Sequence, residues 1–213
     1  DDRSTKKQSI VDRLYSGRMG RTSTARDRML DAACSLIRNQ GYEGVGVAEV
    51  CSVADVRKGS FYHYFESKQA LTREVINEQW RHERARWVAV LSAPGQPLTR
   101  LEALFGMHVD DIREQQDSNF INGCLFANLS LELSTRDAAI RSDLQSVFDD
   151  QIALVAEVLD DAVADGSLRV ADTTAHLAAA MLAQLEGTIL FAKLRNDASV
   201  LDGLWSQISR LVA

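Results

Sequence analysis

Proline is scarce in this chain, which has only 2 among 213 residues, so long uninterrupted helices are permitted. No apolar run reaches the ~20 residues that a membrane-spanning helix needs. The longest candidate, 177–194, is interrupted by Gln184, Glu186 and Lys193. The N-terminus lacks the apolar segment of a secretory signal. Strand-like alternation of useful length and internal repeats are also absent, so the sequence predicts an all-α protein.

Cysteine is also rare, and its three positions, Cys34, Cys51 and Cys124, lie far apart. An odd, dispersed set predicts neither a disulfide framework nor a paired zinc site, and it favours a cytoplasmic protein. The histidines are scattered, and no phosphate-binding loop or nucleophile elbow is present. We therefore expect no metal, no cofactor and no enzyme activity. A helical enzyme would need Cys124 as nucleophile with His108 or Glu132 as its partner.

Charge is distributed unevenly. The net charge is −6, but residues 1–68 carry 12 basic and 9 acidic side chains. The remainder is strongly acidic. A basic N-terminal part on an acidic body is typical of a protein that grips phosphates at one end. Residues 1–22 are expected to form a flexible basic arm, in which Arg18 and Arg21, together with Arg26 just beyond it, could reach DNA; a solubilising leader is the alternative.

Apolar residues spaced three and four apart predict a series of helices. The break at Ala93–Pro97 separates the fourth helix from the fifth. We expect a helix-turn-helix domain at 23–68 and a second helical domain at 69–213, which the family resemblance given below implies to be a ligand-binding and dimerisation domain. The expected helices cover residues 24–40, 47–53, 57–64, 67–91, 98–115, 123–134, 137–164, 173–195 and 200–212.

Two short helices joined by a tight turn at Ala54–Val56, with a longer helix behind them, indicate a helix-turn-helix. The second short helix presents polar and basic residues at its N-terminal end, where free amides and the helix dipole favour phosphate. Phe61, Tyr64 and Phe65 are expected to anchor it. An ordinary solvated basic face is the alternative. The predicted DNA contacts are Arg57, Lys58, Gly59, Ser60, Tyr62, His63 and Lys68.

Residues 24–71 resemble the N-terminal domain of the TetR/AcrR repressor family, through Gly41–Tyr42, Ala48–Val50 and Lys58–Leu71. The resemblance implies a three-helix DNA-binding head, a helical ligand-binding body and a homodimer on a palindromic operator, and it places DNA contacts at the positions just given. Two departures stand out. Val45–Gly46 replaces a Thr-Thr pair, so only the backbone amide at Gly46 remains for phosphate. Asp55 replaces the glycine of the turn.

The last two helices are expected to form the dimer interface. Residues 173–195 alternate small Ala with Leu, Met and Ile, and the final segment carries an apolar stripe. Two helices from each protomer would form a four-helix interface about a twofold axis. Packing within one subunit is the alternative. The predicted interface residues are Ala178, Leu182, Leu204, Trp205, Ile208 and Leu211.

The segments 123–133 and 186–194 are similar to a branch of the family that responds to electrophiles and to acrylate. The resemblance implies a sensing cysteine at Cys124 and a lysine at Lys193, and an ammonium near a thiol would lower the thiol pKa. A packed, inert Cys124 and a pocket for a noncovalent ligand are equally open. The predicted ligand-binding residues are Phe105, His108, Phe120, Cys124, Phe126, Asn128, Glu132, Glu186, Phe191 and Lys193.

Together these features predict a homodimeric, cytoplasmic DNA-binding repressor that leaves its operator when a small molecule or an electrophile acts on the body. A pivot of the long fourth helix would change the spacing of the two reading heads. The alternatives are a covalent switch at Cys124 and a helical enzyme or small-molecule binding protein that does not bind DNA.

Overall fold

The computed structural model describes residues 24–169 and 172–211. This part of the chain is helical and contains no strand, which confirms the predicted fold class. The chain divides into two compact units, Asp1–Val75 and Ile76–Ala213, which we call the head and the body. The expected basic arm at 1–22, with Arg18 and Arg21, lies outside the described residues.

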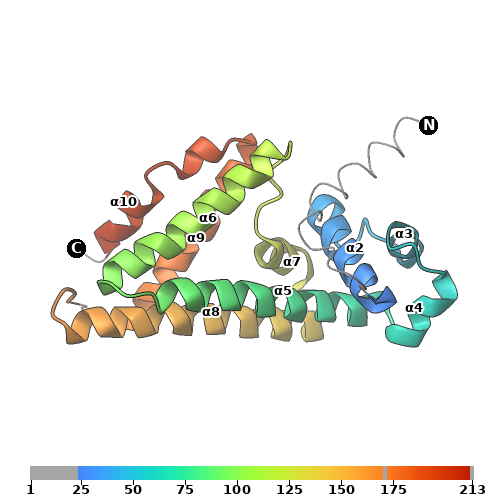
Figure 1. The fold of residues 1–213 in the computed structure, drawn as a ribbon, viewed down its shortest axis with the longest axis horizontal. Coiled ribbons are helices and arrows are strands. Elements are labelled where there is room, and N and C mark those ends of the chain that lie inside the picture. Colours follow the sequence, from blue (N-terminus) through green and yellow to red (C-terminus); the bar gives the residue numbers. More distant parts are fainter. Residues whose placement is uncertain (1–23, 170–171, 212–213) are drawn as a thin grey trace. The chain divides into compact units, whose positions relative to one another are not determined.

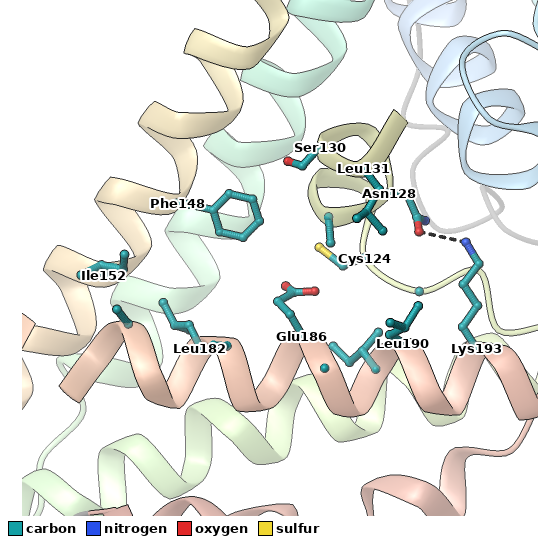
Figure 2. Close-up of a pocket in the computed structure, with 16 residues that line it drawn as sticks. Cys124, Asn128, Ser130, Leu131, Phe148, Ile152, Leu182, Glu186, Leu190 and Lys193 are labelled. Atoms are coloured by element: carbon teal, nitrogen blue, oxygen red, sulfur yellow. Dashed lines mark hydrogen bonds between the residues drawn. The ribbon is translucent and has the colours of Figure 1, made fainter. Parts of the chain in front are cut away.

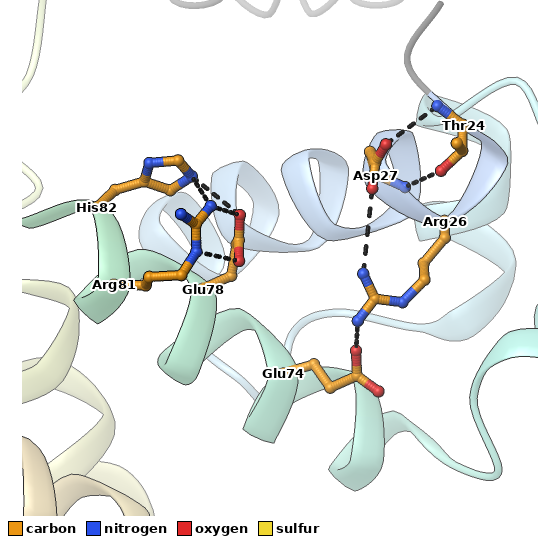
Figure 3. Close-up of polar contacts among 7 residues, drawn as sticks. All are labelled: Thr24, Arg26, Asp27, Glu74, Glu78, Arg81 and His82. Carbon is orange, nitrogen blue, oxygen red and sulfur yellow. Dashed lines mark hydrogen bonds and ion pairs between the residues drawn. The ribbon is translucent and has the colours of Figure 1, made fainter.

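The head is built from α2 (Ala25–Gln40), α3 (Val47–Val53), α4 (Lys58–Tyr64) and the first turns of α5 (Lys68–Leu91). Thr24 caps α2 in a reciprocal capping box with Asp27 (Figure 3), an arrangement that satisfies two backbone donors at a helix start. α2 is buried on all sides from Ala32 to Ile37, and α3 packs against it through Val50 and Cys51. Each of these helices begins and ends within one residue of its predicted bounds.

The body contains the remainder of α5 with α6 (Pro97–Asp117), α7 (Leu125–Leu133), α8 (Ala138–Ala164) and α9 (Thr174–Arg195). α8 packs against α6, α7 and α9, and its buried face includes Val147, Val155 and Leu159. Within the body part of α5, Arg81 and His82 both contact the carboxylate of Glu78 (Figure 3). The hydrogen bond from Arg81 is the main reason that the Glu78 pKa falls to about 2.

The end of the chain differs from the prediction of one helix at 200–212, which is wrong. Instead, a 3₁₀ turn, η1 (Ala198–Leu201), is followed by a five-residue helix, α10 (Leu204–Ile208), and a second 3₁₀ turn, η2 (Ser209–Leu211). Gly203 has φ +77°, in the left-handed region that glycine adopts without steric cost. This turn interrupts the segment although its apolar residues keep helical spacing.

Candidate functional site

The first candidate site is the exposed face of α4 in the head. Phe61 and Phe65 are buried, and their ring centroids lie 5.6 Å apart. Because these two rings hold one side of α4 against the head, the other side faces outward. We call this side the recognition face. It carries the exposed residues Arg57, Lys58, Gly59, Tyr62 and His63, and the half-buried Ser60.

Tyr64 belongs to the outer side of the helix and not to its anchor. The side chain is 39% exposed, and its ring lies edge-on to the ring of His63. The expectation that Tyr64 helps to anchor α4 is therefore wrong. Phe61 and Phe65 are 0% and 2% exposed, so they form the buried anchor, and Tyr64 lies at its edge beside the Phe65 ring.

The turn between α3 and α4 fixes the angle at which α4 is presented. Asp55 adopts φ +51°, the left-handed conformation that costs a non-glycine residue energy. Arg28 donates from its Nε to the carbonyl of Ala54 over 3.0 Å and so ties the turn to α2. At the start of α3, exposed Gly46 occupies the N-cap position without a side-chain cap, which leaves helix amides for another acceptor.

Two of the candidate basic residues are engaged inside the head. Lys68 donates from its Nζ to the carbonyls of Tyr42 and Val45, over 3.1 and 3.2 Å, and lies 3.9 Å from the Tyr42 ring centroid. The Arg26 guanidinium pairs with Glu74 (Figure 3). The structure therefore gives Lys68 an internal role, which sequence reasoning missed because the residue type alone suggests phosphate.

The second candidate site is a cavity of about 440 Å³ in the body, between α7, α8 and α9 (Figure 2). Its wall is almost entirely apolar. Cys124, Asn128, Glu186 and Lys193 are the predicted ligand-binding residues that line it. The other lining residues are Gly123, Ala127, Ser130, Leu131, Phe148, Ile152, Ala179, Leu182, Ala183, Gly187, Ile189 and Leu190.

Three predicted aromatic residues belong to the packed core of the body and do not line this cavity. Phe105 stacks on Trp205. The ring of His108 meets Trp87 edge-on, and burial lowers the His108 pKa to about 4. Phe126 is buried with its ring edge toward Trp80. Their apolar helical positions indicated burial, which a core satisfies as well as a pocket does.

The remaining predicted ligand residues lie outside the cavity wall as well. Phe120 and Phe191 are exposed, and half-buried Glu132 is not among the lining side chains. Sequence reasoning missed the α8 contribution, Phe148 and Ile152, which Figure 2 shows facing Cys124 and Glu186. Their four-residue spacing on α8 was the available signal.

Lys193 is held at one end of the cavity by an amide. Its Nζ donates to Oδ1 of Asn128 over 2.9 Å (Figure 2), and the Asn128 side chain donates in turn to the carbonyl of Asn122. Gly123 packs against the aliphatic stem of Lys193, where a Cβ would lie 3.2 Å from Cδ, and its φ is +76°. Both the contact and the backbone conformation therefore favour glycine here.

Cys124 and Glu186 both line this cavity, where their side chains face each other (Figure 2). Burial raises the pKa of the Cys124 thiol well above its ordinary value, and the carboxyls of Glu186 and Glu83 raise it further. Burial also raises the Glu186 pKa to about 7. Atom Oε2 of Glu186 is buried and has no hydrogen-bond partner in the described part of the chain. The pair is therefore a neutral thiol beside a carboxyl that is partly protonated at neutral pH.

The two partners that a Cys124 nucleophile would need lie outside the cavity that Cys124 lines. The His108 ring packs against Trp87, and the half-buried Glu132 is not a lining residue. Within residues 24–169 and 172–211, no cluster of three or more His, Cys, Asp or Glu side chains could hold a metal ion.

The predicted dimer residues divide into buried and exposed positions. Ala178, Leu182, Leu204 and Ile208 are buried within one protomer, Trp205 is half-buried, and Leu211 is 45% exposed. The outer face of α9 instead carries the exposed apolar side chains Leu190, Phe191 and Leu194. By length and composition α9 could cross a membrane, and only 33% of its most apolar window is buried. Its buried face packs against α8.

The comparisons with known proteins match both the head and the body. Residues 29–75 match the family described as bacterial regulatory proteins, tetR family, and residues 97–208 match the tetracyclin repressor-like C-terminal domain. The chain is 28% identical to the HTH-type transcriptional repressor DhaR of Mycobacterium sp. (strain GP1), over 86% of this chain and 89% of that protein. It is 32% identical to the transcriptional regulator AcuR of Cereibacter sphaeroides, over 81% and 78%.

A solved structure extends the match to three dimensions. The crystal structure of the reduced form of E. coli NemR superposes with a TM-score of 0.81 at 26% identity, covering 89% of this chain and 97% of that one. The head and the body are therefore both matched, by sequence and by fold. The chain belongs to the TetR family and is a DNA-binding transcriptional regulator of the helix-turn-helix type.

Proposed function

We propose that this chain is a cytoplasmic homodimeric repressor that leaves a palindromic operator when a small apolar molecule occupies the cavity of the body. The observation that carries the proposal is the presence, in one chain, of an exposed recognition face and a preformed apolar cavity. The repressors DhaR and NemR are relatives of the chain. A regulator of this kind needs both a DNA contact and a ligand contact.

The recognition face would contact DNA through residues of two kinds. Arg57 and Lys58 can donate to guanine edges or phosphates, while Tyr62 and His63 suit the phosphate backbone. Gly59 has open space where a Cβ would lie, so the backbone can approach DNA closely. Gly46 offers the free amides at the start of α3. Two such heads in a dimer would bind half-sites roughly 34–36 Å apart.

The homodimer would form through the outer face of α9 and the end of the chain. Phe191 and Leu194 are the exposed large side chains of α9 near that end, and Leu211 is exposed in η2. Large apolar side chains with this much exposure favour an interface over a solvated surface. The interface proposed here therefore differs from the one predicted from the sequence. Its residues are exposed, whereas the predicted residues Ala178, Leu182, Leu204 and Ile208 are buried within one protomer.

The effector would bind without a covalent bond. The wall of the cavity is apolar, and its few polar groups, Asn128, Glu186 and Lys193, would orient the molecule. Because burial raises the pKa of the Cys124 thiol well above its ordinary value, little of the thiolate that attacks electrophiles would be present at neutral pH. The apolar cavity therefore favours a noncovalent effector over a covalent switch at Cys124.

Replacing Arg57 by Ala is expected to weaken operator binding about tenfold and to reduce the slope of affinity against salt by about one ion. Sites would be obtained by selection from random DNA, and affinities measured by fluorescence anisotropy at several salt concentrations. Arg169→Ala, an exposed arginine of the body, is the matched control and should change neither quantity. Failure to select any palindromic site would contradict the proposal.

Alkylation of Cys124 by N-ethylmaleimide is expected to be slower at pH 7 than that of a free cysteine, and to accelerate several-fold in Glu186→Gln. Removing the neighbouring negative charge lowers the thiol pKa and increases the thiolate fraction. The rate would be followed by mass spectrometry of the Cys124 peptide. Glu157→Gln, at an exposed position of α8, is the control.

Fast alkylation in the wild type, together with operator release that Cys124→Ser abolishes, would instead establish the covalent switch. Release by a noncovalent ligand should survive in Cys124→Ser, because serine keeps the shape of the cavity wall.

A further inference from the structure

The carboxyl of Glu186 lines the cavity without a cationic partner in the described part of the chain. Figure 2 shows it pointing from α9 toward Cys124 and Phe148. Lys193 extends toward the opposite end, about two turns or about 10 Å further along α9, where its Nζ donates to Asn128. The Oε2 atom of Glu186 is buried, and among the described residues it has no hydrogen-bond partner. One carboxyl oxygen therefore lacks a donor, and the group lacks a compensating charge.

The charged groups around Glu186 make this end of the cavity negative. The titratable groups among the described lining residues are Cys124, Glu186 and Lys193. Glu83 of α5 acts on the same place, because its negative charge raises the pKa of both Cys124 and Glu186. The lining side chains from α8 are apolar. Two carboxyls beside an apolar wall produce a field that attracts a positive charge.

We propose that the effector is a small apolar amine, bound as an ammonium cation that donates to the Glu186 carboxylate while its apolar part fills the cavity. The inference rests on the proposed effector-controlled repressor and deepens it, because it names the chemical class of the effector. An ammonium supplies both the hydrogen-bond donors and the positive charge that this carboxyl lacks. The nearby ring of Phe148 stabilises a cation as well when the cation lies over its face.

Neutral and anionic ligands of the same shape fit this end of the cavity less well. An alcohol satisfies the free carboxyl oxygen but leaves the buried negative charge uncompensated. A carboxylate would meet the like charges of Glu186 and Glu83, and it would find a cation only at the Lys193 end. Benzylammonium, benzyl alcohol and benzoate carry these three head groups on one ring, so they discriminate between the classes.

The affinity for a cation should depend on pH in a defined direction. Burial raises the Glu186 pKa to about 7, so this carboxyl is mostly protonated at about pH 6 and mostly ionised at about pH 8 in the free protein. An ammonium binds the ionised form, and binding at about pH 6 therefore releases close to one proton. The affinity for benzylammonium should be roughly tenfold lower at about pH 6 than at about pH 8. Benzyl alcohol has no charge and should not show this increase.

Isothermal titration calorimetry on the full chain measures the three affinities, and titrations in two buffers of different ionisation enthalpy measure the released proton. At about pH 8 we expect benzylammonium to bind at least tenfold more tightly than benzyl alcohol, and benzoate to bind most weakly. Glu186→Gln should remove the preference for the cation, the pH dependence and the proton release, while it retains the affinity for benzyl alcohol. Glu157→Gln, at an exposed position of α8, is the matched control and should behave as the wild type does.

Benzyl alcohol or benzoate that binds as tightly as benzylammonium at about pH 8 would overturn the amine and leave a repressor with an apolar effector intact. A cation preference that survives in Glu186→Gln would also overturn it, because the cation would then bind elsewhere. If none of the three bound, both the amine and the cavity as effector site would be overturned. Benzylammonium that binds as expected but leaves operator affinity unchanged, measured by fluorescence anisotropy, would instead contradict the proposed function and leave the amine site standing.

Discussion

Replacing Glu186 by Gln is expected to stabilise the protein by up to about 3 kcal/mol at pH 8, and to change its stability little at pH 4. Burial raises the folded-state pKa of Glu186 from 4.5 to about 7. The folded state therefore keeps this proton to a higher pH than the unfolded chain does. Ionisation of the buried Glu186 carboxyl lowers the stability of the wild type. This loss of stability is absent below about pH 4.5, grows as the pH rises, and is complete above about pH 7.

Urea unfolding between pH 4 and 8 at fixed protein concentration measures this difference. Glu157→Gln on the exposed side of α8 should follow the wild-type curve throughout. If the free energy of unfolding varied with pH in the same way in the wild type and in Glu186→Gln, Glu186 would be solvated. Its carboxyl would then carry no buried charge above neutral pH.

Replacing Lys68 by Met is expected to destabilise the head by about 2 kcal/mol, because two hydrogen bonds from a charged donor are lost together with its contact to the Tyr42 ring. Methionine keeps most of the aliphatic stem. The loop before α3 would lose its connection to α5, so operator affinity should fall about tenfold. The slope of affinity against salt should stay unchanged, because no phosphate contact is removed.

This pattern differs from that of Arg57→Ala, where the salt slope falls and stability is retained. Thermal unfolding and salt-dependent anisotropy on the same samples distinguish the two. A lower salt slope in Lys68→Met at unchanged stability would assign Lys68 to the DNA contact that its sequence position suggests.

Local signals predicted the helices well, and they predicted the site less well. Thr24, Asp137 and Thr173 each cap a helix at the residue where the sequence indicates a start, because side-chain capping depends only on near neighbours. The break at Gly203 was missed because the apolar spacing continues across it. Periodicity identifies the buried face of a helix, but it does not show whether a core or a cavity lies against that face.

The cavity illustrates this limit. Phe105 and Phe126 satisfied every sequence criterion for a pocket lining, yet they pack against Trp205 and Trp80. Phe148 and Ile152 line the cavity from α8, 24 or more residues along the chain from Cys124. The position of the cavity depends on how α7, α8 and α9 pack together. The sequence of any one of these helices does not determine that packing.

The five-residue α10 has few backbone hydrogen bonds of its own. It is held to the body by the buried Leu204 and Ile208 and by the stacking of Trp205 on Phe105. A segment secured by side chains in this way opens locally at a lower free energy than the long helices around it. Its amides should therefore exchange with deuterium before those of α8, and Trp205 provides a fluorescent reporter of that opening within an otherwise folded body.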